Sequence, residues 1–215
     1  MHNGTSTSTA RRRYARTRKE AAGCQACELW ARATQTVFGT GPVPARLMLV
    51  GEQPGDREDI EGAPFVGPAG RILDEAMDVA GIDREAAFLT NVVKHFRWRP
   101  SPNGKRRLHE KPTKANITAC LPWVQRELEL VQPEVLVALG ATAVDGLLGK
   151  GVSVMRDRGR PIDSPLASTV LVTIHPSAVL RARDDRDEMF DGLVRDLRLA
   201  ARALRPSGSG STPAE

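Results

Sequence analysis

Residues 46–55 read Arg-Leu-Met-Leu-Val-Gly-Glu-Gln-Pro-Gly, an apolar run that passes directly into a polar turn. The run is too short for a helix and does not alternate in polarity, which is typical of a strand buried on both faces of a parallel sheet. Two glycines and a proline around Glu52 predict a tight turn that holds this carboxylate at the end of the strand. An ordinary turn with an exposed glutamate is the other interpretation of this motif.

Three more apolar runs have the same character, and helical patterns lie between them. The further strands are expected at Ala87–Thr90, Val135–Leu139 and Val170–Ile174. Helices are expected at Gly70–Ala80, Thr113–Val131, Thr142–Leu148 and Glu188–Leu204. Strands that alternate with helices predict an α/β fold, here a three-layer α/β/α sandwich with a central four-stranded, mainly parallel sheet. Ligands bind such sheets at the carboxyl ends of the strands.

The composition is that of a soluble globular protein with a real core, because 40% of the 215 residues are hydrophobic and 27% are charged. We expect one domain over residues 21–205, with a disordered basic tail at 1–20 and a disordered tail at 206–215. No apolar stretch approaches the roughly 18 residues of a membrane helix. The N-terminus lacks the apolar segment of a secretory signal. The expectation is therefore a cytoplasmic monomer without an obligate protein partner.

The formal charge of +5 favours a polyanionic partner only weakly. It is concentrated in an N-terminal basic run, Arg11–Lys19, and in the segment Lys94–Lys114. A basic tail is more often a solvated arm, whereas a basic loop within a fold is better support for phosphate contacts.

Other strand ends also carry candidate functional residues. His175 follows the last strand and precedes Pro176. Because a proline disfavours helical geometry in the residue before it, the chain changes direction here, and His175 is expected at the same rim as Glu52. A lone histidine is usually structural, but opposite a rim carboxylate it can act as an acid, a base or an oxyanion donor. The turn at residues 139–142 is interpreted as close strand–helix packing. Phe65, flanked by Gly and Pro residues, is either a core residue or a stacking surface for a planar ligand.

Cysteine usage points to metal or redox chemistry. Cys24 and Cys27 form a Cys-x-x-Cys pair, and Cys120 is the third and last cysteine. An odd number of cysteines without a signal peptide argues against a disulfide framework.

Four motifs occur in order along the chain, at 51–55 (Gly-Glu-Gln-Pro-Gly), 64–70 (Pro-Phe-Val-Gly-Pro-Ala-Gly), 90–94 (Thr-Asn-Val-Val-Lys) and 175–177 (His-Pro-Ser). With the Cys-x-x-Cys pair, they resemble the iron–sulfur uracil-DNA glycosylases over roughly residues 20–205. The combination is far more specific than any one motif.

The resemblance implies a role for each matching residue. Phe65 would stack on an extruded uracil, Asn91 would hydrogen-bond its Watson–Crick edge, and His175 would stabilise negative charge on its oxygen. Pro176 and Ser177 would press on the DNA backbone beside the bound nucleotide.

The metal ligands implied by the resemblance depart from the family pattern. In these enzymes four cysteines are expected, and the third follows the Asn-Val-Val-Lys stretch, where this chain has His95. The set is therefore three thiolates and one imidazole, a combination that both iron–sulfur clusters and structural zinc accept. Spacing alone favours zinc, whereas the resemblance favours a [4Fe-4S] cluster with a structural role. The implied ligands are Cys24, Cys27, His95 and Cys120.

Residues 96–112 lack periodicity and contain an Asn-Gly turn, so a long loop is expected there. Within it, Lys-Arg-Arg-Leu-His at 105–109 resembles the Lys-Arg-Arg-x-His insertion of UdgX-type proteins, which are similar to the iron–sulfur glycosylases but form a covalent bond to DNA. Gln53 and His95 agree with that branch. A basic DNA-contacting loop with an incidental histidine is the alternative.

The UdgX-type resemblance implies a mechanism in which His109 attacks C1′ of the sugar after the uracil has left. Glu52 would orient the imidazole or accept its proton, with Gln53 beside the substrate. Arg107 would hold the loop, and the phosphate contacts would come from Lys105 and Arg106. The expected partner is uracil-containing DNA, preferably single-stranded. The alternatives are an ordinary multiple-turnover glycosylase and a non-catalytic, zinc-stabilised nucleic-acid-binding module.

Overall fold

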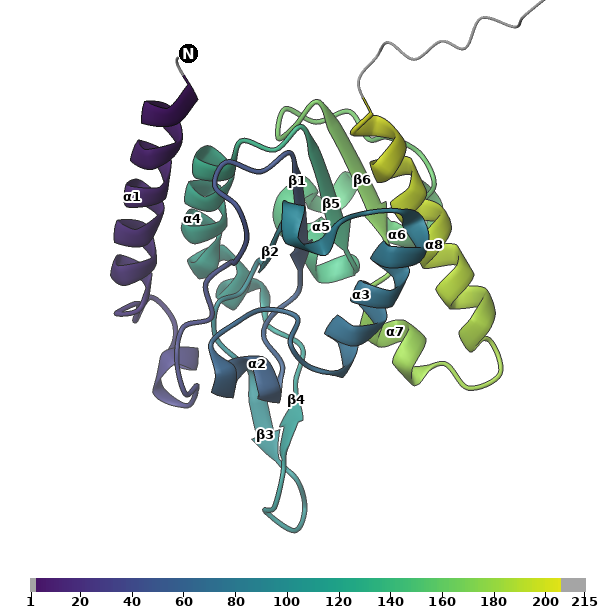
Figure 1. Cartoon of the computed structure of the whole chain (residues 1–215). Coiled ribbons are helices and arrows are strands. Elements are labelled where there is room, and N and C mark those ends of the chain that lie inside the picture. Colours follow the sequence, from purple (N-terminus) through teal and green to yellow (C-terminus); the bar gives the residue numbers. More distant parts are fainter. Residues whose placement is uncertain (1–2, 206–215) are drawn as a thin grey trace, which may run out of the picture.

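The computed structural model describes residues 3–205 and is built around one parallel sheet (Figure 1). The strands are β1 (Leu47–Gly51), β2 (Ala87–Asn91), β5 (Val135–Leu139) and β6 (Thr169–Thr173). Their order is β2-β1-β5-β6, and every pair is parallel. Almost every strand residue is buried, as expected for a sheet covered on both faces. The predicted strands and the predicted α/β fold are confirmed.

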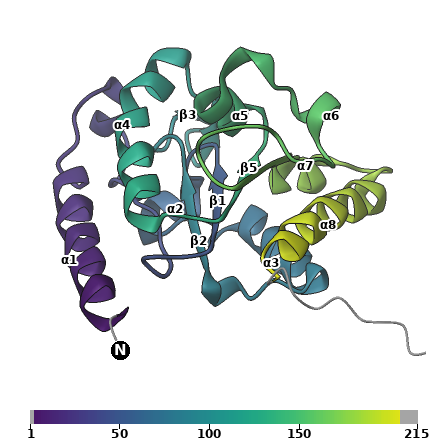
Figure 2. The same cartoon turned by 90° about the horizontal axis from the view of Figure 1, so that it is seen from above.

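Helices cover both faces of the sheet (Figure 2). On one face α8 (Arg186–Ala203) packs against β5 and β6, and α3 (Pro68–Ala80) and α7 (Pro176–Arg181) pack against α8. The other face packs against α4 (Lys114–Val131) and α5 (Ala141–Leu148). Short helices complete the fold: α2 (Asp56–Glu61), α6 (Val154–Asp157) and the 3-10 turns η1 (Glu28–Ala31), η2 (Arg84–Ala86) and η3 (Gly149–Gly151).

Local signals explain where the longer helices begin and end. Pro68 lies in the first turn of α3, and Gly81 ends that helix in the left-handed region, with φ of 75°. Thr113 caps α4, and its hydroxyl accepts the backbone N–H of Asn116 in a capping box. The predicted helix boundaries hold to within two residues at these ends.

The N-terminal segment differs from the expected disorder. Residues 3–21 form a helix, α1 (Asn3–Ala21), that packs against α4. The Tyr14 hydroxyl donates to the carbonyl of Gly39, and its ring lies 5.9 Å from that of Phe88, edge to face. The inward residues are small or polar, so the apolar periodicity of a helix is hidden in the sequence. They are Ala10, Tyr14, Thr17 and Ala21.

The loop expected over residues 96–112 contains a hairpin that projects from the domain (Figure 1). Strands β3 (Trp98–Pro100) and β4 (Arg107–His109) pair antiparallel, with Trp98 opposite His109. Asn103 Oδ1 accepts the Ser101 hydroxyl and the backbone N–H of Lys105, which closes the tip. Three residues a strand are too few to give a recognisable alternation, which is why the sequence indicated only a loop.

Single bridges outside the named strands cover both edges of the sheet. Thr40 pairs with Leu89 on β2, and Ile162 pairs with Val170 on β6. None of the helices in the described part of the chain is both long and apolar enough to cross a membrane. The expected C-terminal tail at 206–215 lies outside the described residues.

Candidate active site

The carboxyl ends of the four strands bring polar residues to one rim. Asn91 ends β2, Glu52 follows β1, Thr142 follows β5 and His175 follows β6. Because the strand order is β2-β1-β5-β6, these residues line the rim in that order. The candidate catalytic and substrate-binding residues therefore lie together at the carboxyl edge of the sheet, as predicted.

Gly51 forms the floor at the point where these groups converge. A Cβ at this position would lie 2.6 Å from Phe65 Cζ, closer still to Asn91 Oδ1, and 3.4 Å from His175 Nε2. A side chain would occupy the space that these groups share. Phe65, Asn91 and His175, the three residues predicted from the sequence, therefore face one small volume above Gly51, which has no side chain.

Phe65 is held in a strained conformation. Its φ is 57°, which a bulky residue rarely adopts and which costs about 1–3 kcal/mol. The first turn of α3 packs closely against the Phe65 backbone, because a Cβ on Gly70 would collide with the Phe65 carbonyl. Phe65 is 5% exposed, and its ring centroid lies 6.1 Å from that of His175 with 30° between the ring planes, so Phe65 is both part of the core and a wall of the site.

His175 is fixed in one tautomer by its neighbours. The Arg181 guanidinium can only donate, and it donates to Ser177 Oγ at 2.9 Å. The Ser177 hydroxyl is then free to donate to His175 Nδ1 at 2.8 Å, and the Ser177 backbone N–H also donates there. Nδ1 is thus an acceptor, and Nε2 carries the proton toward the floor of the site. Burial, helped by Arg181 and His109, lowers the pKa of His175 to about 4, so a neutral donor faces the site.

Glu52 links the rim to the hairpin. Its Oε2 accepts the Thr142 hydroxyl, which fixes the carboxylate over the end of β5. Its other oxygen lies 3.4 Å from His109 Nε2. The side chain of His109 is about half exposed, at 49%, and its pKa is lowered, first by partial burial and then by Arg181, although Glu52 and Glu58 oppose this.

The Gln53 side chain holds the hairpin to the rim. Its Oε1 accepts the Arg97 backbone N–H at 3.1 Å, and its Nε2 donates to the carbonyls of Arg97 and Glu110. These bonds fix which end of the amide is nitrogen. Nε2 also lies 2.9 Å from His109 Nε2, so its two hydrogens are shared among three acceptors, and this contact favours the His109 tautomer with a lone pair on Nε2 and the proton on Nδ1. Glu52 Oε1 is more distant from His109 Nε2, at 3.4 Å, so the contact with Gln53 is the stronger influence on this tautomer.

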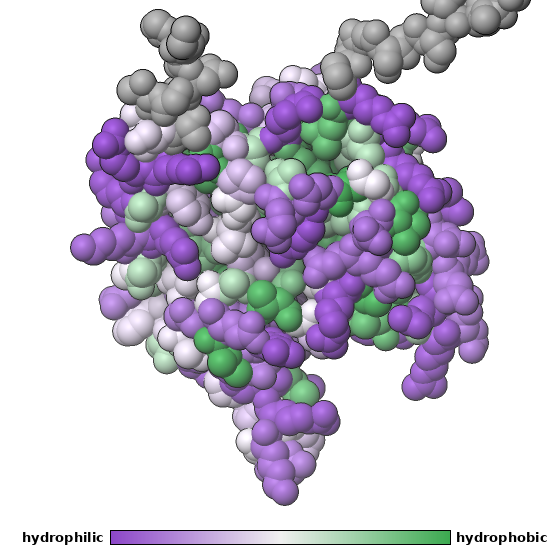
Figure 3. Space-filling view, in the orientation of Figure 1, coloured by the Kyte–Doolittle hydropathy of each residue, from purple (hydrophilic) through white to green (hydrophobic). Residues whose placement is uncertain are grey.

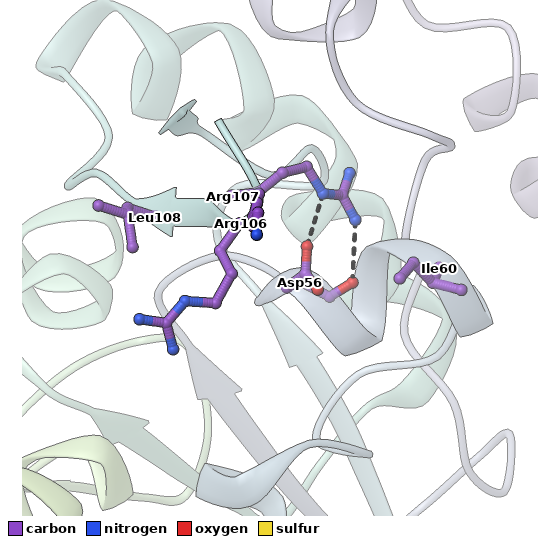
Figure 4. A pocket seen from close by; sticks show the side chains of 6 residues that line it. Asp56, Ile60, Arg106, Arg107 and Leu108 are labelled. Carbon is purple, nitrogen blue, oxygen red and sulfur yellow. Dashed lines mark hydrogen bonds and ion pairs between the residues drawn. The ribbon is translucent and has the colours of Figure 1, made fainter. Parts of the chain in front are cut away.

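Arg107 fastens the other side of the hairpin to α2. Its guanidinium contacts Asp56 Oδ1 at 2.5 Å (Figure 4). It also contacts Asp59 Oδ2 at 2.5 Å, and Asp59 is fully buried. Lys105 and Arg106 are exposed at the hairpin tip and line a hollow of about 490 Å³ beside Asp56. The structure places Arg107 as a loop anchor and leaves the two tip residues open to solvent.

A buried ion pair lies directly behind Asn91. Lys94 Nζ bonds to Glu127 Oε2 at 2.6 Å and to the Asn91 carbonyl at 2.7 Å, and both charged side chains are essentially inaccessible. Glu127 also accepts the Thr90 hydroxyl and the backbone N–H of Gly39. The network ties the end of β2 to α4 and fixes the backbone that carries Asn91.

The residues expected to hold a metal lie near the start of α4. Within residues 3–205, no three His, Cys, Asp or Glu side chains meet in metal-ligand geometry. Burial raises the pKa of Cys120 to about 11; the Lys94 backbone N–H, which Cys120 Sγ accepts, opposes this, and Cys27 and Cys24 add to it, which indicates that both lie near Cys120. His95 Nδ1 is buried without a hydrogen-bond partner among the described residues. Cys24 Sγ accepts the Trp123 indole N–H at 3.1 Å. By donor type alone, three thiols and an imidazole suit a metal or cluster.

Three other residues were missed from the sequence or assigned a lesser role. Thr142 donates to Glu52, whereas the sequence indicates only close strand–helix packing at this turn. The close packing is present as well, because a Cβ on Gly140 would lie 2.8 Å from His175 Cβ. The position of Thr142 after a central strand was an available signal. Arg181 and Asp59 had none, since their roles depend on tertiary contacts. Pro176 is buried in the first turn of α7 and offers little surface for the predicted backbone contact.

Comparison with known proteins identifies the family of this chain. The sequence pattern of the Uracil DNA glycosylase superfamily matches residues 38–198. The chain is similar to the type-4 uracil-DNA glycosylase of Thermotoga maritima, with 39% identity over 86% of this chain and 91% of that protein. It is also similar to the type-4 enzyme of Pyrobaculum aerophilum, with 36% identity over 80% and 86%, and to that of Sulfurisphaera tokodaii, with 34% over 76% and 74%.

Proposed function

Because this chain belongs to the uracil DNA glycosylase superfamily, we propose that it excises uracil from DNA and then bonds to the remaining sugar through His109. Similarity to type-4 uracil-DNA glycosylases supports the first part. The observation that carries the second is the position of His109 Nε2, 2.9 Å from Gln53 Nε2 and 3.4 Å from Glu52 at the rim. Single-stranded DNA is the favoured substrate, since its bases need not be unpaired before extrusion.

Excision uses the groups that converge over Gly51. Uracil stacks against Phe65, and Asn91 hydrogen-bonds its edge. The bond between C1′ and the base breaks, and its electron pair leaves with uracil. The neutral His175 donates its Nε2 proton in a hydrogen bond to the uracil oxygen, where the negative charge develops. A preorganised neutral donor avoids the cost of burying an imidazolium there.

Trapping uses the lone pair of His109 Nε2. The cleaved sugar lacks an electron pair at C1′, and the imidazole supplies it to form a new carbon–nitrogen bond. The ring becomes positively charged beside Glu52 until the Nδ1 proton leaves to solvent, and the departed uracil anion takes up a proton. The new bond has no facile leaving group, so one protein molecule is consumed for each uracil.

Denaturing electrophoresis tests the trap directly. After mixing with a uracil-containing single strand, a heat-stable band of protein plus DNA should form, at no more than one strand per protein. A strand of the same sequence with thymine in place of uracil is the matched control and should give no band. Free uracil released over many turnovers without any band would exclude trapping and leave an ordinary glycosylase.

His109→Ser separates the two steps. The variant should lose the adduct and release free uracil, because Phe65, Asn91 and His175 remain in place and water can reach C1′. The measurement is uracil release alongside the gel. An inert variant would mean that His109 also serves bond cleavage, and the assignment of separate groups to the two steps would then fail.

We also propose that Cys24, Cys27, His95 and Cys120 hold a structural [4Fe-4S] cluster, with zinc as the alternative. Similarity to type-4 enzymes and the unpartnered His95 nitrogen support this. The purified protein should contain iron and acid-labile sulfide and absorb near ~400 nm. Cys120→Ser should lose the iron, whereas His95→Cys, which supplies a fourth thiolate, should keep it. A colourless protein with one zinc would overturn the proposal.

A multiple-turnover uracil-DNA glycosylase is the second candidate. It is favoured by the 39% identity to the Thermotoga maritima enzyme over most of both chains. The same gel distinguishes the two candidates, because turnover yields uracil in excess over protein.

A further inference from the structure

Helix α1 carries a dense cluster of cations that the glycosylase site does not use. Its inward side packs on α4, and the rest of its surface bears six exposed cations, with Glu20 among them. Figures 1 and 2 show α1 at the periphery of the molecule with its outer side open, and this side is strongly hydrophilic in Figure 3. We call this surface the α1 basic face: Arg11, Arg12, Arg13, Arg16, Arg18 and Lys19.

The α1 basic face is poorly neutralised. Its one acidic neighbour with a described ion pair is Glu20, which lies 3.6 Å from Arg16 but also contacts Arg126 of α4 at 2.6 Å. Arg12, Arg16 and Lys19 follow one another at i, i+4 and i+7, so like charges stand on adjacent turns and repel. Surfaces built for solubility usually intersperse both signs, and this face departs from that pattern.

The helix is also fixed in place, which distinguishes it from a solvated arm. Tyr14 bonds to Gly39, packs beside Phe38 at 5.7 Å, and anchors α1 to the fold. Ordered cations lose less freedom on binding than those of a flexible tail. Figure 1 shows that α1 runs alongside α4 and that its C-terminal end points toward the end of the molecule with the hairpin and the rim.

We propose that the α1 basic face binds the phosphates of the DNA strand that flanks the nucleotide at the rim. Charge complementarity selects the partner: a row of exposed arginines and a lysine on a helix roughly 30 Å long matches a linear polyanion. The inference rests on the proposed function only in taking DNA as the partner. It adds a second contact region, outside the residues 38–198 that match the superfamily pattern.

The test removes the outermost stripe of charge. Arg12→Gln, Arg16→Gln and Lys19→Gln are combined in one variant, because glutamine keeps helix propensity. Affinity for a uracil-free single strand of about 20 nucleotides is measured by fluorescence anisotropy over a range of salt concentrations. The variant should bind at least about tenfold more weakly, with a salt slope smaller by about 2, since each phosphate contact on a single strand contributes about 0.7.

A matched control removes the same charge elsewhere. Arg195, Arg198 and Arg202 are exposed on α8, on the opposite side of the molecule (Figure 2). Their triple change to Gln should leave binding close to that of the parent protein. Equal weakening of both variants would mean that net charge alone matters, and would overturn the proposal, as would unchanged binding of the α1 variant.

Two further measurements keep the outcome separate from the proposed activity. With a strand of about six nucleotides, too short to leave the rim and run along the helix, the α1 variant should bind like the parent. Single-turnover uracil excision at saturating protein should be unchanged in the α1 variant. Because uracil-free DNA reports only binding, failure of the glycosylase proposal would leave this result intact, and the reverse also holds.

Discussion

At the scale of single residues, Gly51 determines how closely a base can approach the backbone. Gly51→Ala should lower single-turnover uracil release about 100-fold, because displacement of Asn91 and Phe65 by about an ångström misplaces the substrate. Gly151→Ala is the matched control, since a Cβ there meets nothing within 4 Å. Thermal unfolding should show that both variants remain folded. Full activity in Gly51→Ala would mean that the base does not lie over this floor.

The protonation of His109 sets a pH dependence for trapping. Its pKa lies below the ordinary histidine value of about 6.5, first through burial, so the ring is neutral at pH 7 and its Nε2 lone pair is not protonated. The rate of adduct formation should be level from about pH 7 to 8. Below the lowered pKa it should fall about tenfold per pH unit, because one added proton removes the nucleophile.

The control for this profile is uracil release by His109→Ser. His175 has a pKa of about 4 and stays neutral over most of the range, so this variant should show no comparable decline above pH 5. Rates are measured with rapid mixing and gel quantification. The same acid limb in both proteins would assign the titration to another group.

The candidate residues were predictable to the extent that they follow strand ends. Glu52, Asn91 and His175 could be placed at one rim because parallel strands share a carboxyl edge. The tautomers of His175 and His109 could not be predicted, since they depend on Arg181 and Gln53 contacts made across distant parts of the chain. Nor did any sequence signal reveal that Asp59 anchors Arg107.

At the scale of elements, the Lys94–Glu127 pair joins β2 to α4. Glu127→Gln should destabilise the fold by about 3–5 kcal/mol, because it leaves the Lys94 ammonium buried without a counter-charge. The measurement is chemical denaturation. Glu129→Gln, two residues along the same helix and exposed, is the matched control and should change stability by less than about 0.5 kcal/mol. Equal effects of the two changes would contradict a structural role for the pair.

Elements with a continuous apolar pattern were predicted well, and those without one were not. The four strands were found because each is a buried run of about five residues. Helix α1 was missed because its packing depends on one tyrosine with small or polar neighbours. The hairpin was missed because polar contacts through Gln53 and Arg107 hold it, instead of apolar burial.

At the scale of the whole molecule, the layered fold follows from the alternation of strands and helices, and the sequence predicted it. The distribution of charge over the molecular surface did not follow in the same way. The basic run near the N-terminus was visible in the sequence, but its fixed position beside α4 depends on Tyr14 and its contacts with the aromatic residues below it. The number of charged residues predicts that a partner would be anionic, whereas the fold shows where on the surface the basic residues lie.

The attachment of the hairpin has a consequence for how this architecture can change over generations. No residue from 97 to 111 belongs to the hydrophobic core, and the hairpin is fastened by polar contacts at Gln53 and at α2. Such a segment can be gained, lost or transplanted without refolding the sheet beneath it. The hairpin is therefore a separable segment. A related protein with a glutamine and two aspartates at the corresponding positions has the side chains that hold it.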